Sequence, residues 1–176
     1  MTLGPTPTPD FGSIFEEQLT YVWGSLRRLG VRHADLEDQA HEVFLRVHAR
    51  LKDYDTARPI RPWLFAFVFR VASDYRRLAL HRVEVLGASP EAVDPERPAD
   101  LRIQAAEDRA LLLAALDAVE IDRRAVLILH DIDEVPVPAI AEALGIPVGT
   151  AYSRLRLGRE ELATALRRLR KQRGDP

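Results

Sequence analysis

The sequence predicts an all-α protein with two small helical domains joined by a flexible linker, the C-terminal one containing a helix-turn-helix. Three observations support this fold class. Apolar residues recur at helical spacing through most of the chain. The 12 prolines gather in short stretches between those helical patterns, where they mark loops and turns. A stretch rich in Pro, Ala and acidic residues, with no sustained period, separates two halves that differ in pattern.

Two amphipathic helices are expected at the start of the first half. The first runs from Phe11 to about Leu29 and is followed by Gly30, which suits a C-cap. The second follows Asp35, which we expect to cap its first turn by accepting backbone hydrogen bonds. The apolar stripes are Ile14, Phe15, Leu19, Val22, Trp23 and Leu26 in the first helix, and Leu36, Ala40, Val43, Phe44, Val47 and Leu51 in the second.

A loop at residues 53–62 precedes a third helix, which we expect to begin near Trp63. The two prolines of this loop exclude a regular helix within it. The segment WLFAFVFRVASDYRR alternates like a strand, but its length and its helical neighbours favour a helix. Because its first part is apolar on every side, we expect that part, with Trp63, Phe65 and Phe67, in the core.

The change in composition after His81 indicates where the domains divide. We expect a disordered leader at residues 1–10, a first domain at 11–80, a linker at 81–104 and a second domain at 105–173. The linker segment VEVLGASPEAVDPERPADL combines helix-breaking prolines with too few apolar residues to form a core of its own.

The overall composition excludes several classes of protein. No apolar run approaches the roughly 20 residues that cross a bilayer, so membrane insertion is not expected. The N-terminus lacks the basic and apolar regions of a secretory signal. The absence of cysteine excludes disulfides and zinc-thiolate sites and fits a reducing cytoplasm. The net charge of −2 at first argues against nucleic-acid binding.

The second domain ends in two helices separated by a tight turn. The segments AAEDRALLLAALDAV and IDRRAVLILHDI predict two earlier helices, and a short helix then leads to Gly145, which can take a positive φ. Pro147 suits the start of the long helix that follows. This order and spacing are those of a DNA-binding helix-turn-helix, whose second helix lies in the major groove. An ordinary helical hairpin is the alternative.

A helical wheel of the long helix separates a core face from a base-contacting face. The core face carries Ala151, Leu155, Gly158 and Leu162. The opposite face carries Ser153, Arg156 and Leu157, flanked by Thr150 and Arg154 on one side and by Tyr152 and Arg159 on the other. Arginine can donate two hydrogen bonds to guanine or hold a phosphate. Eight basic residues accompany two acidic ones from Arg154 to Arg173, a local excess that the net charge of the whole chain hides.

Two unlike motifs give the chain a family resemblance. The segment AIAEALGIPVGTAYSRLRLGREEL resembles the upstream-promoter-binding domain of bacterial extracytoplasmic-function (ECF) RNA polymerase sigma factors. DLEDQAHEVFLRVHARL is similar to the helix that binds the polymerase clamp in that family, and WLFAFVFRVASDYRR to the helix after its promoter-melting loop. The resemblance covers nearly everything from Phe11 to Leu169 and implies a sigma region 2-like domain at 11–80 and a sigma region 4-like domain at 105–173.

The resemblance implies a protein with no catalytic centre, cofactor or metal site. Its partners would be core RNA polymerase, promoter DNA and an anti-sigma factor, and it would recognise two promoter boxes and assist DNA melting. By this resemblance, the residues expected to bind polymerase are Asp35, Glu37, Asp38, Glu42 and Arg46. Those carried over to DNA binding are Arg61, Arg70, Arg76 and Arg77 for the downstream box, and Thr150, Tyr152, Ser153, Arg154, Arg156 and Arg159 for the upstream box.

The chain departs from the family pattern at a few positions. Many relatives have lysine in place of Tyr152, arginine in place of Leu157, and an Arg-Asn pair in place of Phe69 and Arg70. These departures leave the promoter sequence open. The melting loop also lacks the glycine and small polar residues usual in the family, so its base preference is equally open.

Three other classes were weighed against this one: a sigma-like adaptor that binds a regulator, a helix-turn-helix repressor, and an enzyme. An enzyme would use two histidines or an acidic cluster, namely His41 and His48, or His130, Asp131, Asp133 and Glu134. The two histidines lie two helical turns apart, too far to share a metal easily. The acidic cluster resembles a solvated turn before Pro136.

Overall fold

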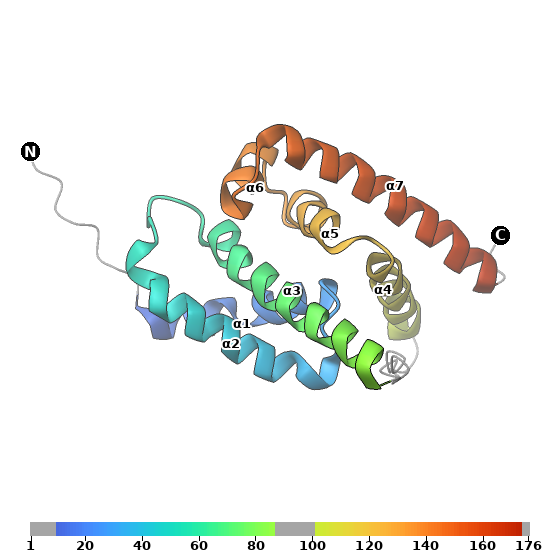
Figure 1. The fold of residues 1–176 in the computed structure, drawn as a ribbon, viewed down its shortest axis with the longest axis horizontal. Helices are drawn as coiled ribbons and strands as arrows, with labels where there is room; N and C mark the ends of the chain where they lie inside the picture. Colours follow the sequence, from blue (N-terminus) through green and yellow to red (C-terminus); the bar gives the residue numbers. More distant parts are fainter. Residues whose placement is uncertain (1–9, 87–100, 174–176) are drawn as a thin grey trace, which may run out of the picture.

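The computed structural model describes residues 10–86 and 101–173 and is helical in both parts (Figure 1). The first half contains α1 (Phe11–Arg28), α2 (Leu36–Arg50) and α3 (Ile60–Leu86), with 3-10 turns at His33–Asp35 and Leu51–Asp53. The second half contains α4 (Leu101–Asp117), α5 (Ile121–Leu127), α6 (Val137–Leu144) and α7 (Val148–Arg173), with a π-helical segment at Ile128–Ile132. The predicted all-α class is confirmed.

The leader and much of the predicted linker lie outside the described residues. Residues 1–9 of the leader are not described, whereas Asp10 is the N-cap of α1, and its carboxylate accepts a hydrogen bond from the Ser13 N–H at 3.0 Å. Helices α3 and α4 both extend into the range 81–104 predicted as linker, and its middle, residues 87–100, is not described.

Gly30 ends the first helix as the sequence predicts. It has a φ of +92°, the left-handed region that glycine adopts without strain. The Gly30 N–H donates to the Arg27 carbonyl at 3.0 Å and the Val31 N–H to the Leu26 carbonyl at 3.0 Å, so the last carbonyls of α1 are satisfied. The chain can therefore turn directly into α2.

The apolar stripe of α2 is buried as predicted, but two local details of the first half differ. Asp35 stands at the N-cap of α2 without capping it; its carboxylate accepts instead from Tyr75 Oη at 2.6 Å and Arg32 Nε at 2.9 Å. Helix α3 begins at Ile60 rather than near Trp63, because a proline in the first turn of a helix loses no intrahelical hydrogen bond. Phe65 is fully buried in α3, which confirms the helical interpretation of that segment.

The turn of the helix-turn-helix has the predicted glycine at its centre. Gly145 caps α6 with φ 66° and ψ 39°, in the left-handed region. Its N–H donates to the Glu142 carbonyl at 3.2 Å, and the Ile146 N–H donates to the Ala141 carbonyl at 2.9 Å. Helix α7 follows at once after Pro147, so the two helices are held at a short, defined turn.

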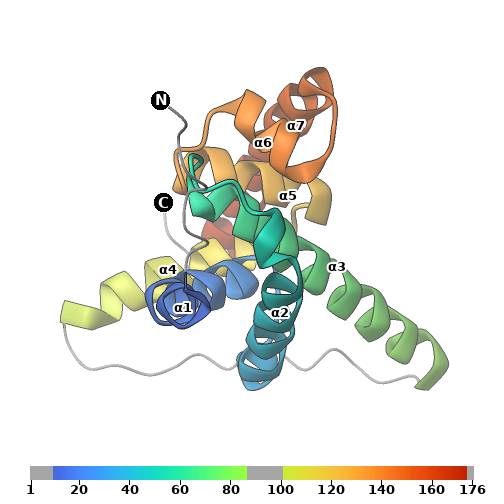
Figure 2. The ribbon, with the colours of Figure 1, turned by 90° about the vertical axis from the view of Figure 1, so that its left-hand side faces the viewer.

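The two halves share one hydrophobic core. In Figure 1, α3 lies between the pair α1 and α2 and the second half, where it contacts α6, and Figure 2 shows α4 beside α1, which it contacts. From the first half the cluster includes Val22, Leu26, Leu64, Phe65, Val68 and Val71, and from the second half Ala125, Val126, Ile128, Leu129, Val137 and Ile140. The two predicted domains are thus packed against each other in this structure.

A buried arginine lies where the halves meet. The Arg124 side chain has no exposed surface; its Nε and Nη2 donate to the Val119 carbonyl at 3.2 and 2.9 Å, and its Nη1 to Asp117 Oδ1 at 2.8 Å. Burial, together with the nearby charge of Arg76, lowers the pKa of Arg124 to about 10, so it stays charged at neutral pH. Asp117 also pairs with Arg76 of α3 at 3.5 Å, which links the halves.

We expect Arg124→Met to lower the free energy of unfolding by about 1–3 kcal/mol, because the buried Val119 carbonyl then has no donor. Chemical denaturation of the whole chain measures this change. The neighbouring Arg123→Met is the control, since Arg123 is partly exposed and its pair with Glu161 contributes about 0–1 kcal/mol. Equal losses for both variants would contradict the special role of Arg124.

Candidate nucleic-acid interface

Helix α7 presents the predicted base-contacting face to solvent. Tyr152 is 57% exposed and the Arg156 side chain 66% exposed, and Ser153 is also exposed. On the predicted core face, Ala151, Leu155 and Gly158 are buried, while Leu162 is half-buried. Thr150 and Leu157 are half-buried, at the borders between the two faces. The helical wheel therefore identified the buried face, whereas Leu157, which it placed at the centre of the opposite face, is half-buried.

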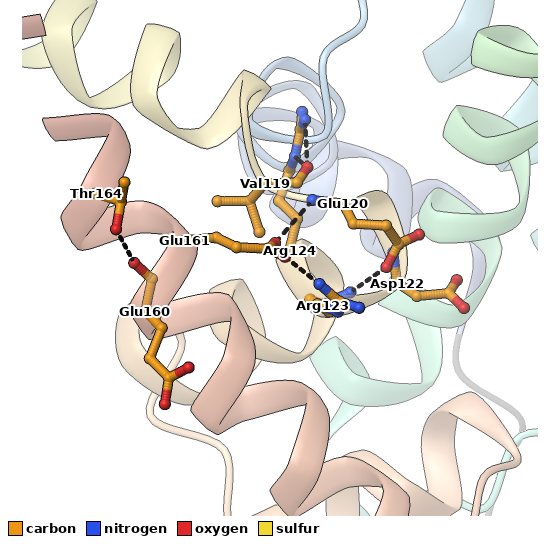
Figure 3. Close-up of polar contacts among 8 residues, drawn as sticks. All are labelled: Val119, Glu120, Asp122, Arg123, Arg124, Glu160, Glu161 and Thr164. Atoms are coloured by element: carbon orange, nitrogen blue, oxygen red, sulfur yellow. Dashed lines mark hydrogen bonds and ion pairs between the residues drawn. The ribbon is translucent and has the colours of Figure 1, made fainter. Parts of the chain in front are cut away.

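The position of α7 is set by close packing against α5. At Gly158 a Cβ atom would lie 3.2 Å from the Arg123 carbonyl oxygen, closer than ordinary van der Waals contact, so a side chain there would require the Arg123 backbone to shift. Figure 3 shows Glu161 of α7 directed at the start of α5. Its carboxylate forms an ion pair with Arg123 and accepts from the Glu120 N–H at 3.2 Å. These contacts fix the rotation of α7 about its axis.

The three arginines in the first half of α7 have different surroundings. Arg154 is only 26% exposed and pairs with Asp122 of α5 at 2.5 Å, so it points to the flank of the helix. Arg156 pairs with Glu160 of the same helix at 2.7 Å and stays largely in water. Arg159 donates to Asp131 through Nη2 at 2.5 Å and Nε at 2.9 Å. Of the three, Arg156 is the most exposed.

A shallow groove runs beside the first half of α7. Its volume is about 450 Å³, and His130, Tyr152, Arg156, Arg159 and Glu160 contribute polar or aromatic side chains to its lining. The hydrogen bond from Arg159 holds the pKa of Asp131 below its ordinary value, so this carboxylate is ionised at neutral pH. The groove itself carries both signs of charge through Arg156, Arg159 and Glu160, with exposed donors at Tyr152 and Arg156.

The predicted downstream-box arginines lie along α3, and their surroundings also differ. Arg61 is exposed, with its guanidinium 5.1 Å from the centre of the Tyr21 ring. Arg70 is exposed, and the 79% exposed Arg77 pairs with Asp74 at 3.2 Å. Arg76 is 32% exposed and turned toward Asp117 of the second half.

A second groove of about 450 Å³ lies between the end of α2 and the start of α3. Arg50, Asp53 and Arg70 supply its charges, Trp63 and Phe67 its aromatic surface, and the full lining is Arg46, Ala49, Arg50, Asp53, Trp63, Ala66, Phe67, Arg70 and Ala143. Trp63 is half-buried and makes an edge contact with Phe67 at 4.9 Å between ring centres. The predicted core position is therefore correct for Phe67, whereas Trp63 keeps one side accessible to the groove.

The predicted polymerase-binding residues share the polar side of α2. Glu37 and Asp38 are exposed in its first turn, and Glu42 is half-buried one turn further on. Glu42 accepts from Arg46 Nε at 2.7 Å, and Arg46 also pairs with Asp74 of α3 at 3.3 Å. Asp35 is separate from this row because its carboxylate is engaged by Tyr75.

Of the residues considered for an enzyme, His130 Nδ1 lies 2.7 Å from Asp131 Oδ1, but the two aspartates of this cluster have different partners. Asp131 pairs with Arg159, whereas Asp133 accepts from Tyr21 Oη at 2.7 Å. Across residues 10–86 and 101–173, no three His, Cys, Asp or Glu residues are grouped so that they could hold a metal ion. In the same part of the chain, no helix is long and apolar enough to span a membrane.

Sequence reasoning missed the polar contacts that join the two halves. Tyr21 and Asp133 are 112 positions apart, and the Arg58 and Glu142 ion pair joins residues 84 positions apart. No local pattern marks either pair, because the two partners of each pair lie far apart in the sequence. Only the packing of the halves brings them together.

Comparisons with known proteins match both halves. The family model of sigma-70 region 2 matches residues 14–79, and that of sigma-70 region 4 matches residues 109–162. The chain is 33% identical over 159 residues to the ECF RNA polymerase sigma factor SigL of Mycobacterium tuberculosis, with 89% of each chain covered. It is 30% identical over 154 residues to the ECF RNA polymerase sigma factor SigW of Bacillus subtilis, with 81% of each covered.

Two solved structures have a similar fold. One is CnrH in complex with the cytosolic domain of CnrY, with a TM-score of 0.63, 23% identity and coverage of 89% of this chain and 86% of the other. The second is the sigma factor RpoE in complex with the anti-sigma factor NepR from Bartonella quintana, with a TM-score of 0.64, 22% identity and coverage of 87% and 96%. At these identities the likeness concerns the fold.

The packing of α7 on α5 predicts a difference between two glycines of the same helix. We expect Gly158→Val to be less stable than Gly149→Val by about 1–3 kcal/mol, because a side chain at Gly158 meets the Arg123 backbone while nothing lies within 4 Å of the Cβ position at Gly149. In both changes valine replaces a residue of lower helix propensity, so the difference between them reports the contact at Gly158. Thermal or chemical denaturation compares them, and equal stability would contradict the close approach of α5 and α7.

Proposed function

Since this chain belongs to the ECF RNA polymerase sigma factors, which direct promoter-specific transcription initiation, we propose that it recognises two promoter boxes and assists DNA melting. In this proposal the first half, residues 11–80, binds the downstream box, and the second half, residues 105–173, binds the upstream box. The polymerase carries out the chemistry of RNA synthesis, so the chain itself needs no catalytic centre.

One observation carries the assignment of the upstream box. The exposed face of α7 follows a short glycine turn and consists of Tyr152, Ser153 and Arg156, on a helix that α5 holds in place. A helix with donors on its outer face can enter the major groove and contact base edges. The different surroundings of Arg154 and Arg156 support different roles, a phosphate contact at the flank and a base contact at the centre.

Two features of the first half support the downstream assignment. Arg61, Arg70, Arg76 and Arg77 supply positive charge along the start and middle of α3. The adjoining groove combines Arg70 with the aromatic rings of Trp63 and Phe67. Extended single strands bind where arginines neutralise the backbone and aromatic faces receive bases. Such a groove suits a strand that has left the duplex.

Core RNA polymerase is the first partner that we propose, bound through the polar side of α2. An anti-sigma factor is the second, because RpoE, one of the structural relatives, was solved in complex with the anti-sigma factor NepR. Both partners and the promoter place the chain in the cytoplasm. A net charge of −2 is compatible with this function, since the polymerase supplies much of the surface that contacts phosphates.

The upstream assignment predicts that Arg156→Ala relaxes the preference at one base pair of the upstream box. A lost bidentate contact of arginine with guanine costs about 1–3 kcal/mol, whereas a lost phosphate contact weakens all sequences alike and lowers the salt slope by about one. Arg154→Ala is the matched variant, for which we expect the salt effect. Both are measured in the reconstituted holoenzyme against single-base variants of the upstream box at several salt concentrations.

If neither variant altered promoter choice or salt dependence while transcription stayed normal, α7 would not be a recognition helix. Tight, specific duplex binding by the chain without polymerase would favour the repressor class instead.

The polymerase assignment predicts that Asp38→Arg with Glu42→Arg weakens binding to core polymerase. Both carboxylates lie off the buried stripe of α2, so the fold should remain intact, although the second change also removes the pair with Arg46. Binding of labelled protein to core polymerase measures the effect. Glu107→Arg on α4 adds the same kind of charge at an exposed position of the other half and serves as the control. Unchanged assembly of the double variant would remove the assignment.

A further inference from the structure

We propose that the second half of the chain masks the downstream-box surface of the first half with carboxylates that occupy the place of DNA phosphates. The arrangement in Figure 1 is then an autoinhibited one, which nucleic acid has to displace. The inference rests on the proposed function in one respect, that the arginines of the loop 53–62 and of α3 bind DNA.

The downstream-box surface is formed by the loop 53–62 and by α3, and three of its arginines lie near acidic residues of the second half. Arg58 of the loop forms an ion pair with Glu142 of α6. Arg76 of α3 pairs with Asp117, the last residue of α4, at 3.5 Å.

The third arginine, Arg61, lies over the ring of Tyr21, and the Tyr21 hydroxyl donates to Asp133 at 2.7 Å. Burial raises the pKa of Asp133, while the hydrogen bond from Tyr21 and the charges of Arg28 and Arg61 oppose that rise. This carboxylate is therefore withdrawn from water at the junction, where the positive charges of the first half stabilise its ionised form. Together with the two ion pairs, it distributes negative charge along the row of arginines, as a nucleic-acid backbone would.

The groove beside the arginines is also closed on one side by the second half. Ala143 of α6 belongs to its lining, together with Trp63, Phe67 and Arg70 of α3. Glu142, the partner of Arg58, is the adjacent residue of α6. A strand that followed the loop and entered this groove would meet α6, so binding of the strand and docking of α6 exclude each other.

Mutual exclusion has a thermodynamic consequence. When a binding-competent state is only partly populated, the apparent affinity is the intrinsic affinity multiplied by the populated fraction. The ligand in turn shifts the population toward the competent state. The shared apolar core favours the closed state in addition to the ion pairs. The chain should therefore bind single-stranded DNA weakly by itself, and any change that weakens closure should tighten that binding.

The pair of Arg58 and Glu142 offers a test in which the direction of the change in DNA affinity depends on whether the two halves are docked. We expect Glu142→Lys to tighten binding of a short, fluorescent single-stranded DNA of random sequence by about two- to fivefold, relative to Glu107→Lys, which adds the same charge at an exposed position of α4 outside the junction. In an Arg58→Glu background the ion pair would re-form with reversed charges, so the same Glu142→Lys change should weaken binding by a similar factor. Circular dichroism verifies that each variant remains folded.

The opening itself is measured in the full chain by energy transfer between dyes on cysteines introduced at Glu17 and Lys171, since the natural sequence has no cysteine. Saturating DNA should change the transfer efficiency. The proposal is overturned if Glu142→Lys changes affinity in the same direction in both backgrounds, if DNA binds without a change in transfer, or if none of the variants binds the DNA. Failure of the proposed function is a separate result, namely normal promoter opening by a holoenzyme that carries Arg61→Ala and Arg70→Ala.

Discussion

The structure depends on the burial of one positive charge, the guanidinium of Arg124. A charge removed from water is tolerated only where hydrogen-bond acceptors and an opposite charge surround it. The Val119 carbonyl and the Asp117 carboxylate supply them, and both lie at the turn between α4 and α5. The turn is therefore fixed, and with it the position of α5, on which α7 packs.

The same cluster extends across the boundary between the halves. Gly30 lies against it; a Cβ atom there would be 2.8 Å from Asp117 Oδ1 and 2.9 Å from Arg124 Nη1. The Asp117 oxygen that pairs with Arg124 also pairs with Arg76 of α3, at 3.5 Å. Loss of the guanidinium would thus disturb the local turn and the docking of the halves together. A buried polar cluster of this kind specifies one arrangement more strongly than apolar contacts, which are not directional.

Arginine serves two purposes in this chain, and the surroundings decide which. Where a guanidinium is fully buried, as at Arg124, it holds the fold in register. Where it stays in water beside a carboxylate of its own helix, as at Arg156, the internal pair is weak and a base or phosphate can replace it. Arg58 and Arg76 lie between these extremes, at a junction that can open.

The sequence by itself determined the helices, the turn at Gly145 and the two faces of α7, because these follow from local rules. Helical periodicity, a glycine able to take a positive φ and the spacing of small residues act over a few positions of the chain. The family resemblance of both halves was equally visible in contiguous motifs. The candidate residues of α2, α3 and α7 could be named for the same reason, although their roles remain predictions.

Only the tertiary structure decided which polar partners those residues have and how the two halves of the chain pack together. Asp35 is bound by Tyr75 rather than capping α2, and Arg154 is held by Asp122, because side chains distant in sequence compete for the same polar groups. The burial of Arg124 and the contact of Tyr21 with Asp133 had no local signal. Such contacts arise from the packing of one apolar surface on another, which is not directional, so the sequence alone does not say which polar groups it brings together.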